Sequence, residues 1–197
     1  ASSMIHAGDN TGMWDEEDGF FYDVLRLPDG SSQRLKVRSM VGLLPLCAAT
    51  TFTGVLLKKY PDIAERFSWF LKSHAELTKN IHQPDKNGLH GRPMASILDE
   101  GRLRRVLAKM LDENEFLSKY GIRSLSKYHA EHPFVFHAGG QEYKVAYLPG
   151  ESDTGMFGGN SNWRGPIWMP VNGLIVRALL QYYGYYGDDF KVECPTG

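Results

Sequence analysis

The stretch PVNGLIVRALLQYYGYY, from Pro170 to Tyr186, carries the clearest structural signal in the 197-residue sequence. Its apolar side chains recur at steps of three and four residues, the spacing of one face of an α-helix. These side chains are Val171, Leu174, Ile175, Ala178, Leu179 and Tyr182. Proline suits the first turn of a helix, and glycine commonly follows the last turn, as Gly187 does here. The stretch therefore predicts a helix over residues 170–186.

The same reasoning extends outward to the rest of the chain. Apolar periodicity predicts helices over residues 61–81 and 99–120, a shorter one over 40–52 and a weaker one over 2–6. Strand-like runs occur at residues 20–27, 134–136 and 143–148. The stretches 87–96 and 150–170 are rich in Gly, Pro and aromatic residues, which is typical of long loops that build a site. The pattern as a whole predicts one mainly α domain over residues 1–197.

Composition narrows the class of protein. Hydrophobic residues make up 42% of the chain, charged residues 23%, and the net charge is -1. This balance is typical of a globular domain, disfavours a nucleic-acid partner, and comes without an apolar run long enough for a membrane span. Cys47 and Cys194 are expected to be reduced thiols, and residues 1–10 lack the layout of a signal peptide. A cytoplasmic location is expected, without a metal ion or other cofactor.

The segment WDEEDGFFYD, from Trp14 to Asp23, combines acids with aromatic rings. Sugar binding uses this mixture, because rings pack on the apolar faces of a pyranose and carboxylates accept hydrogen bonds from its hydroxyls. An acidic turn whose aromatic residues only anchor the core remains an alternative. The spacing of the acids does not match a twelve-residue calcium loop.

The segment FGGNSNWRGPIW, from Phe157 to Trp168, combines ring faces with the donor fork of an arginine. Trp163, Arg164 and Trp168 are the candidate binding residues. A rigid loop pinned by buried indoles is the alternative. A phosphate-binding loop is disfavoured, since the lysine of that motif is absent.

Two further groups of residues could carry chemistry. Glu193 lies in a loop beside a cysteine and a proline, where a carboxylate could be catalytic. Cys194 beside it has no local base, which favours an inert thiol. His129, His132 and His137 lie close together in sequence, but Pro133 interrupts the run and disfavours a metal site.

Four segments arrive in an order that resembles glycoside hydrolase family 63, and more closely its large bacterial glucosidase-like members. They are GDNTGMWDEEDGFFYD (8–23), LKVRSMVGLLPL (35–46), KYGIRSLSKYH (119–129) and GGNSNWRGPIWMPVN (158–172). The resemblance implies an (α/α)6 toroid and hydrolysis of α-glucosidic bonds in oligosaccharides with inversion, with no cofactor. Inverting enzymes use two carboxyl groups about 6.5–9.5 Å apart, one as general acid and the other as base.

The chain also departs from the family pattern. The general acid is expected upstream of Trp14 and the base beyond the last residue, so both catalytic carboxylates are expected outside this chain. Glu193 is a weak candidate substitute for the base. At about 11–12 residues per helix, the chain supplies roughly half of the helices of a toroid. We therefore expect an internal fragment with only part of the toroid, which exposes apolar helix faces, self-associates or binds missing segments of the same protein.

The resemblance assigns roles to individual residues. It places Trp14, Asp15 and Tyr22 in the lining of the sugar pocket, and Trp163, Arg164 and Trp168 in its wall. Asp153 is expected to bind a sugar hydroxyl or to orient Arg164. Arg38, Ser39 and Arg123 are expected to organise loops, the arginines through buried salt bridges.

Three functions follow as hypotheses. The first is an α-glucosidase domain that needs carboxylates from outside the chain. The second is a noncatalytic carbohydrate-binding fragment. The third is an isomerase or lyase in which a His or Tyr acts as base.

Overall fold

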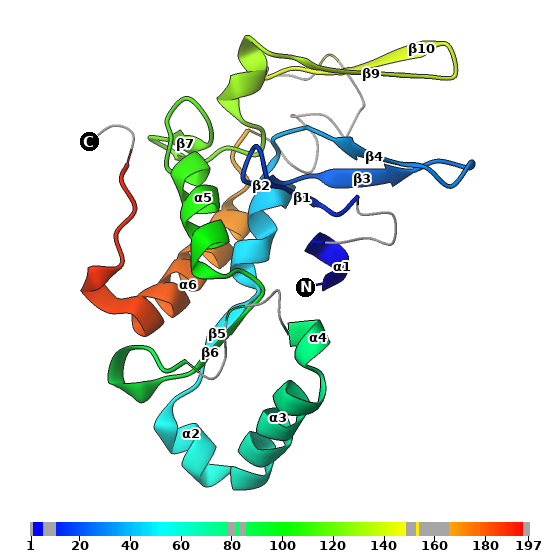
Figure 1. Ribbon diagram of the computed structural model, residues 1–197. Coiled ribbons are helices and arrows are strands. Elements are labelled where there is room, and N and C mark those ends of the chain that lie inside the picture. Colours follow the sequence, from blue (N-terminus) through cyan, green and yellow to red (C-terminus); the bar gives the residue numbers. More distant parts are fainter. Residues whose placement is uncertain are drawn as a thin grey trace.

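The computed structural model describes residues 2–5, 11–78, 82, 86–148, 153 and 166–194 (Figure 1). Within these ranges the helical content is 44% and the strand content is 23%. The strands form five two-stranded antiparallel sheets. The predicted mainly α (α/α)6 toroid is therefore wrong. Segments between the helices pair as strands, and Gly139 and Gly140, whose φ angles of 59° and 77° suit a tight turn, connect Phe134–Ala138 to Gln141–Val145.

The described ranges contain both α-helices and 3-10 helices. They are α1 (Ser2–Ile5), the 3-10 helix η1 (Met40–Cys47), α2 (Gly54–Lys59), α3 (Pro61–Ser73), α4 (Ala75–Thr78), η2 (Leu89–Gly91), α5 (Glu100–Met110), η3 (Lys127–Ala130), α6 (Met169–Tyr186) and η5 (Gly187–Asp189). No helix in the described ranges is long and apolar enough to cross a membrane.

The strands pair with near neighbours along the chain in every sheet but one. The four local pairs are β1 (Trp14–Asp15) with β2 (Phe20–Phe21), β3 (Asp23–Arg26) with β4 (Ser32–Leu35), β7 (Leu117–Ser118) with β8 (Gly121–Ile122), and β9 (Phe134–Ala138) with β10 (Gln141–Val145). The exception joins β5 (Ala49–Thr51) to β6 (Met94–Ser96), with α2, α3 and α4 between them in sequence.

The main core lies where α5, α6 and η1 meet the β1–β2 hairpin. Helix α5 contributes one buried stripe, formed by Leu103, Val106, Leu107 and Met110. Helix α6 contributes another, formed by Val171, Ile175, Ala178, Tyr182 and Tyr185. Phe20 and Phe21 of β2 are almost completely buried in the same cluster. The acidic turn between β1 and β2 is therefore anchored directly on the core.

The helix predicted over residues 170–186 is confirmed as α6. The helix predicted over 99–120 is right only for its first half, because α5 ends at Met110. Asp112 accounts for that end, since its side chain accepts a hydrogen bond from the Asn114 N–H at 2.8 Å and its carbonyl accepts from the amides of Glu115 and Leu117. The chain then turns into β7 and β8.

The segment predicted as a helix over residues 40–52 is a 3-10 helix followed by β5. The helix predicted over 61–81 is divided into α3 and α4, while residues 79–81 lie outside the described ranges. Helix α2 was not predicted at all. The strand predicted over 20–27 is divided between β2 and β3, which belong to different sheets.

Helices α2, α3 and α4 form an arm that projects from the β5–β6 sheet, away from α5 and α6 (Figure 1). Neither α2 nor α3 buries a side chain. Their exposed apolar residues are Val55, Leu56, Ile63, Phe67, Trp69 and Phe70. The expected exposure of apolar helix faces is thus present in the arm, whereas self-association stays a prediction.

Candidate functional site

The acidic turn is a short hairpin with a fixed shape. Trp14 pairs with Phe21 and Asp15 with Phe20 across β1 and β2. The Asp18 N–H donates to Oδ1 of Asp15 at 2.8 Å, and Gly19 adopts a φ of 63° at the end of the turn. A Cβ at Gly19 would lie 2.3 Å from the side chain of Arg105, so glycine is required there for space as well as for conformation.

Asp15 is buried and doubly paired. Its Oδ2 lies 2.8 Å from Arg34 Nη1 and 3.1 Å from Lys36 Nζ. Burial alone would raise the pKa of Asp15. The hydrogen bond from the Asp18 amide and the contacts with Lys36 and Arg34 outweigh burial and hold the pKa below its usual value. Asp15 is therefore a carboxylate at neutral pH.

Asp18 joins this pair to a second group of side chains. The Tyr22 hydroxyl donates to Asp18 Oδ2 at 2.9 Å, and Lys36 Nζ lies 3.2 Å from the same oxygen. These contacts hold the pKa of Asp18 below its usual value although burial opposes them. Burial also raises the pKa of Tyr22, so its phenol keeps the proton that it donates. Arg38 Nη2 lies 3.6 Å from the other oxygen of Asp18.

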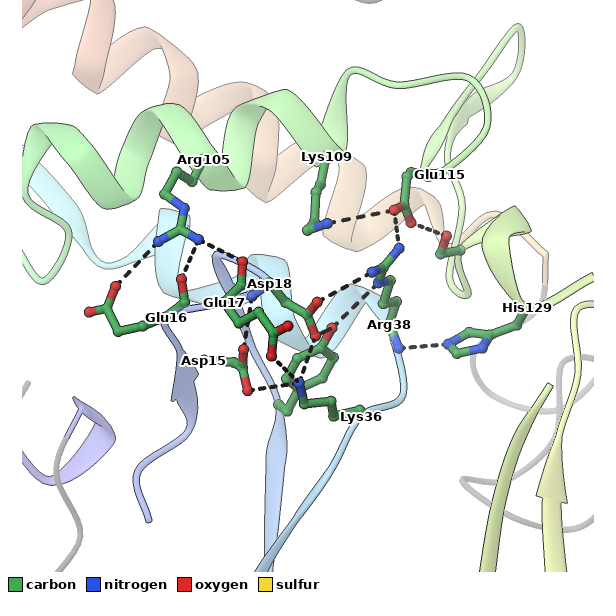
Figure 2. Close-up of polar contacts among 12 residues, drawn as sticks. Asp15, Glu16, Glu17, Asp18, Lys36, Arg38, Arg105, Lys109, Glu115 and His129 are labelled. Carbon is green, nitrogen blue, oxygen red and sulfur yellow. Dashed lines mark hydrogen bonds and ion pairs between the residues drawn. The ribbon is translucent and has the colours of Figure 1, made fainter. Parts of the chain in front are cut away.

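Arg38 links the acidic turn to Glu115, on the loop that follows α5 (Figure 2). Glu115 pairs with Arg38 Nη1, accepts a hydrogen bond from the Ser126 hydroxyl, and lies 3.7 Å from Lys109 Nζ. Glu115 is 8% exposed, so this ion pair is largely removed from water. We call the set Asp15, Asp18, Tyr22, Lys36, Arg38, Lys109, Glu115 and His129 the charged network.

His129 completes the charged network from the other side of Arg38. Its Nε2 accepts the backbone N–H of Arg38 at 2.9 Å, which leaves Nδ1 to donate to the carbonyl of His132 at 2.8 Å. Burial lowers the pKa of His129 and keeps the ring neutral. Both ring nitrogens are engaged, so the described contacts leave His129 no free nitrogen for the base role of the isomerase or lyase hypothesis.

Arg105 holds the acidic turn against α5. Its guanidinium donates to the carbonyl oxygens of Glu16 and Glu17 at 2.5 and 3.0 Å, and it pairs with the Glu16 carboxylate at 3.2 Å (Figure 2). The guanidinium groups of Arg102 and Arg105 also lie 5.6 and 5.5 Å from the ring centre of Trp14. Trp14 is therefore enclosed by cations and core residues, and its buried Nε1–H has no hydrogen-bond partner among the described residues.

A cavity of 620 Å³ lies on the far side of the loop that carries Glu115. Its lining residues are Glu113, Asn114, Leu117, Ser118, Lys119, Tyr120, Arg123, Lys127, Tyr147, Pro166 and Ile167. The loop is a shared wall, because the Glu115 side chain belongs to the charged network while Glu113 and Leu117 face the cavity. Pro166 and Ile167 belong to the NWRGPIW segment, so the cavity adjoins one of the two segments singled out in the sequence.

Glu193 lies at a second, smaller cavity of 440 Å³ beside α5. Its side chain is exposed, and its neighbours in the lining are Arg104, Arg105, Ala108, Lys191 and Val192. Arg105 also binds Glu16 and Glu17, so Glu193 and the acidic turn lie on two sides of the same arginine. No described contact joins Glu193 to Asp15 or Asp18.

The predicted binding residues fall into three groups. Trp14, Asp15 and Tyr22 lie together and are buried. Trp168 is half-buried at the start of α6, and Asp153 is exposed. Trp163 and Arg164 lie outside the described residues. Sugar contact by any of these seven residues stays a prediction.

The charged network was only partly visible in the sequence. The buried salt bridge predicted for Arg38 is confirmed by its pairing with Glu115. The one predicted for Arg123 is not found among the described residues, where its guanidinium donates to the carbonyls of Glu113, Glu115 and Leu117. Glu115, Lys36 and Lys109 were missed. No local signal marks Glu115, which lies 77 positions from Arg38.

Within the described ranges, no group of three or more His, Cys, Asp or Glu side chains is arranged to hold a metal ion. The carboxylates of the charged network are bound by Lys and Arg instead.

Comparisons with known proteins identify the family of this chain. The sequence profile of the glycosyl hydrolase family 63 C-terminal domain matches residues 93–193, which include Glu115, the cavity and Glu193. This match defines a glycoside hydrolase-related domain. The chain belongs to glycoside hydrolase family 63, and the predicted family is confirmed; closeness to its bacterial members stays a prediction.

Two fungal proteins are similar to this chain. The uncharacterized protein YMR196W of Saccharomyces cerevisiae is 50% identical over 186 residues, covering 94% of this chain. A probable mannosyl-oligosaccharide glucosidase of Schizosaccharomyces pombe is 38% identical over 85 residues, covering 43% of this chain. The aligned parts span 17% and 8% of the two relatives.

Proposed function

We propose that this chain forms part of a glycoside hydrolase that cleaves α-glucosidic bonds in oligosaccharides. The observation that carries the proposal is the 620 Å³ cavity, which adjoins the NWRGPIW segment in a chain of family 63. Tyr120 and Tyr147 supply ring faces for a pyranose, while Asn114 and Ser118 supply hydrogen-bonding groups. The glucosidase named among the relatives supports the same substrate class.

The proposed reaction proceeds with inversion and needs a protonated acid and a separate base. Asp15 and Asp18 do not suit the acid role, because their pKa values are held below the usual range by Lys36 and other donors. As ionised carboxylates, they suit pairing with neighbouring cations and accepting hydrogen bonds from sugar hydroxyls. We therefore place both catalytic carboxyl groups outside this chain, and Glu193 is the alternative base within it.

In this proposal the charged network is a support for the sugar site. It ties the acidic turn, through Arg38, to the Glu115 loop that forms one wall of the cavity. A carbohydrate-binding role without catalysis is the second candidate function. The low pKa values of Asp15 and Asp18 favour it, since these two carboxylates are ionised at neutral pH and carry no proton to donate.

Hydrolysis of 4-nitrophenyl α-glucoside tests the proposal, with the 197-residue chain and the longest natural form of the protein measured side by side. We expect the longer form to hydrolyse the glucoside and the first NMR spectra to show β-glucose as its product. We expect no hydrolysis by the 197-residue chain alone. Sugar binding without turnover in both forms would favour the noncatalytic function. Absence of both turnover and binding would refute the two candidates together.

A further inference from the structure

The cavity beside the Glu115 loop carries an excess of positive charge. Lys119, Arg123 and Lys127 line it, and among the described lining residues Glu113 is the one acidic side chain. In the charged network each Lys and Arg lies within 4.0 Å of a carboxylate. By contrast, none of the three cavity cations pairs with a carboxylate of the described residues. Two charged sites that share one wall thus differ in whether their cations are neutralised.

Hydrogen bonds hold the backbone that carries Lys119, Arg123 and Lys127. Arg123 donates to three carbonyl oxygens of the 113–117 loop, and the Lys127 amide donates to the Glu115 carbonyl at 3.0 Å. The β7–β8 hairpin that bears Lys119 is held on α6 by Asn172, which accepts from the Ile122 amide at 2.7 Å and donates to its carbonyl at 3.2 Å. The positive lining is therefore a built feature of the cavity, with only the ends of the lysines free to move.

Aromatic faces lie beside these charges. The Lys119 Nζ is 5.0 Å from the ring centre of Tyr120, and the Arg123 guanidinium is 5.9 Å from that of Tyr147. Tyr120 is 71% exposed, so its ring is open to a ligand. A ring face beside a cation suits a sugar that bears a negative group, because the pyranose stacks while the anion meets the ammonium.

We infer that this cavity binds an anionic substituent, a carboxylate or a phosphate, carried on a glycan, with Lys119 and Lys127 as the recognising charges. The glycan part rests on the proposed function. The preference for negative charge rests on the three lining cations, which pair with no carboxylate in the part of the chain that the structure describes.

The test compares three methyl α-glucoside ligands that differ at carbon 6: the neutral glucoside, the 6-carboxylate and the 6-phosphate. Binding to the 197-residue chain is followed by NMR titration, with inorganic phosphate as a fourth ligand. We expect the two charged glycosides to bind about fivefold to tenfold more tightly than the neutral one at low ionic strength, as two exposed ion pairs would give. The advantage should shrink as salt is added.

The variant pair decides the assignment. Lys119→Gln with Lys127→Gln should remove the advantage of the charged glycosides and leave the neutral one unchanged. Lys58→Gln with Lys59→Gln, on the distant α2, should change neither. Equal affinity for neutral and charged glycosides, an advantage that survives in the first variant, or no binding of any glycoside would each overturn the inference. Inorganic phosphate that binds as tightly as the sugar phosphate would also overturn it, since the glycan would then contribute nothing.

The inference and the proposed function fail in different ways. Turnover of a neutral α-glucoside, with no tighter binding of the charged glycosides, would contradict the inference alone. Charge preference in a protein that cleaves no α-glucoside sinks the proposed hydrolase and leaves an anionic carbohydrate-binding site.

Discussion

Helices α3 and α5 carry equally regular apolar stripes, yet the structure uses them differently. Helix α5 buries Leu103, Val106, Leu107 and Met110 and ends beside the charged network. Helix α3 buries no side chain, and Ile63 on its stripe is 64% exposed. A stripe thus predicts that a helix forms, but which stripe finds a partner depends on the rest of the polypeptide.

The largest expected effect lies at the loop that follows α5. Glu115→Ala leaves Arg38 and the Ser126 hydroxyl without their shared partner in a buried place. Breaking a buried ion pair from one side costs about 3–5 kcal/mol, so urea unfolding should show a loss of that size. Glu131→Ala, at an exposed residue, is the control and should change little. A loss under about 1 kcal/mol for Glu115→Ala would mean that water replaces the carboxylate and that the network is not buried as described.

The second prediction sets the two helices directly against each other. Leu103→Ala on α5 opens a cavity in the core and should lower the free energy of unfolding by about 2–5 kcal/mol. Ile63→Ala on α3 removes an exposed side chain and should change it by less than about 0.5 kcal/mol. The comparison breaks if Ile63→Ala costs as much as Leu103→Ala, because α3 would then be covered in solution. Analytical ultracentrifugation of the same samples would reveal whether a second copy covers it.

The third prediction concerns pH. Burial lowers the pKa of His129 from its ordinary value of 6.5, and the nearby charges that act on it include Arg38, Glu115 and His132. Between the lowered pKa of His129 in the folded protein and its ordinary pKa in the unfolded chain, the ring is therefore protonated only in the unfolded chain. Stability should fall as pH drops below about 6.5, by no more than about 1.4 kcal/mol per pH unit.

Chemical denaturation at pH 5, 6 and 7 measures that slope. His129→Phe should flatten it, although the variant is less stable at pH 7 because the Arg38 amide loses its acceptor. An unchanged slope would assign the pH dependence elsewhere. Asp15 and Asp18 act in a separate window, because their lowered pKa values confer stability that is lost only as pH falls below about 4.

The parts of the fold that the sequence predicted well are those set by local physics. Helix α6 was predicted to within one residue, since its stripe, its early proline and Gly187 all lie within one short stretch. The second half of the helix predicted over residues 99–120 is wrong for a local reason as well. Leu111 continues the stripe of α5, and Phe116 and Leu117 follow, but residues 112–115 are polar and the Asp112 turn competes with the helix, which periodicity does not register.

The candidate site was predicted only where one segment holds it. The acidic turn and its aromatic residues were recognised as a unit, whereas the partners of Arg38 were not. Glu115 and His129 lie 77 and 91 positions away from Arg38, and only the folded chain brings them together. The cavity was missed for the same reason, because Tyr120, Tyr147 and Pro166 come from three separate segments.

The smallest expected effects sharpen the comparison at the helix starts. Asp99 caps α5, accepting from the Arg102 amide at 2.8 Å, and Thr53 caps α2 in the arm, accepting from the Leu56 amide at 3.3 Å. Asp99→Ala should cost about 1 kcal/mol of global stability, the usual value of an N-cap. Thr53→Ala should cost only a few tenths, because α2 buries no side chain and its unfolding is a local event.

Hydrogen exchange separates the two outcomes. In Thr53→Ala, faster exchange should be confined to the arm, while in Asp99→Ala it should extend to the amides of α5 and the Glu115 loop. If Thr53→Ala instead raised exchange throughout the core, the arm would be folded cooperatively with α5 and α6. The arm and α5 would then differ in the exposure of their side chains but not in local stability.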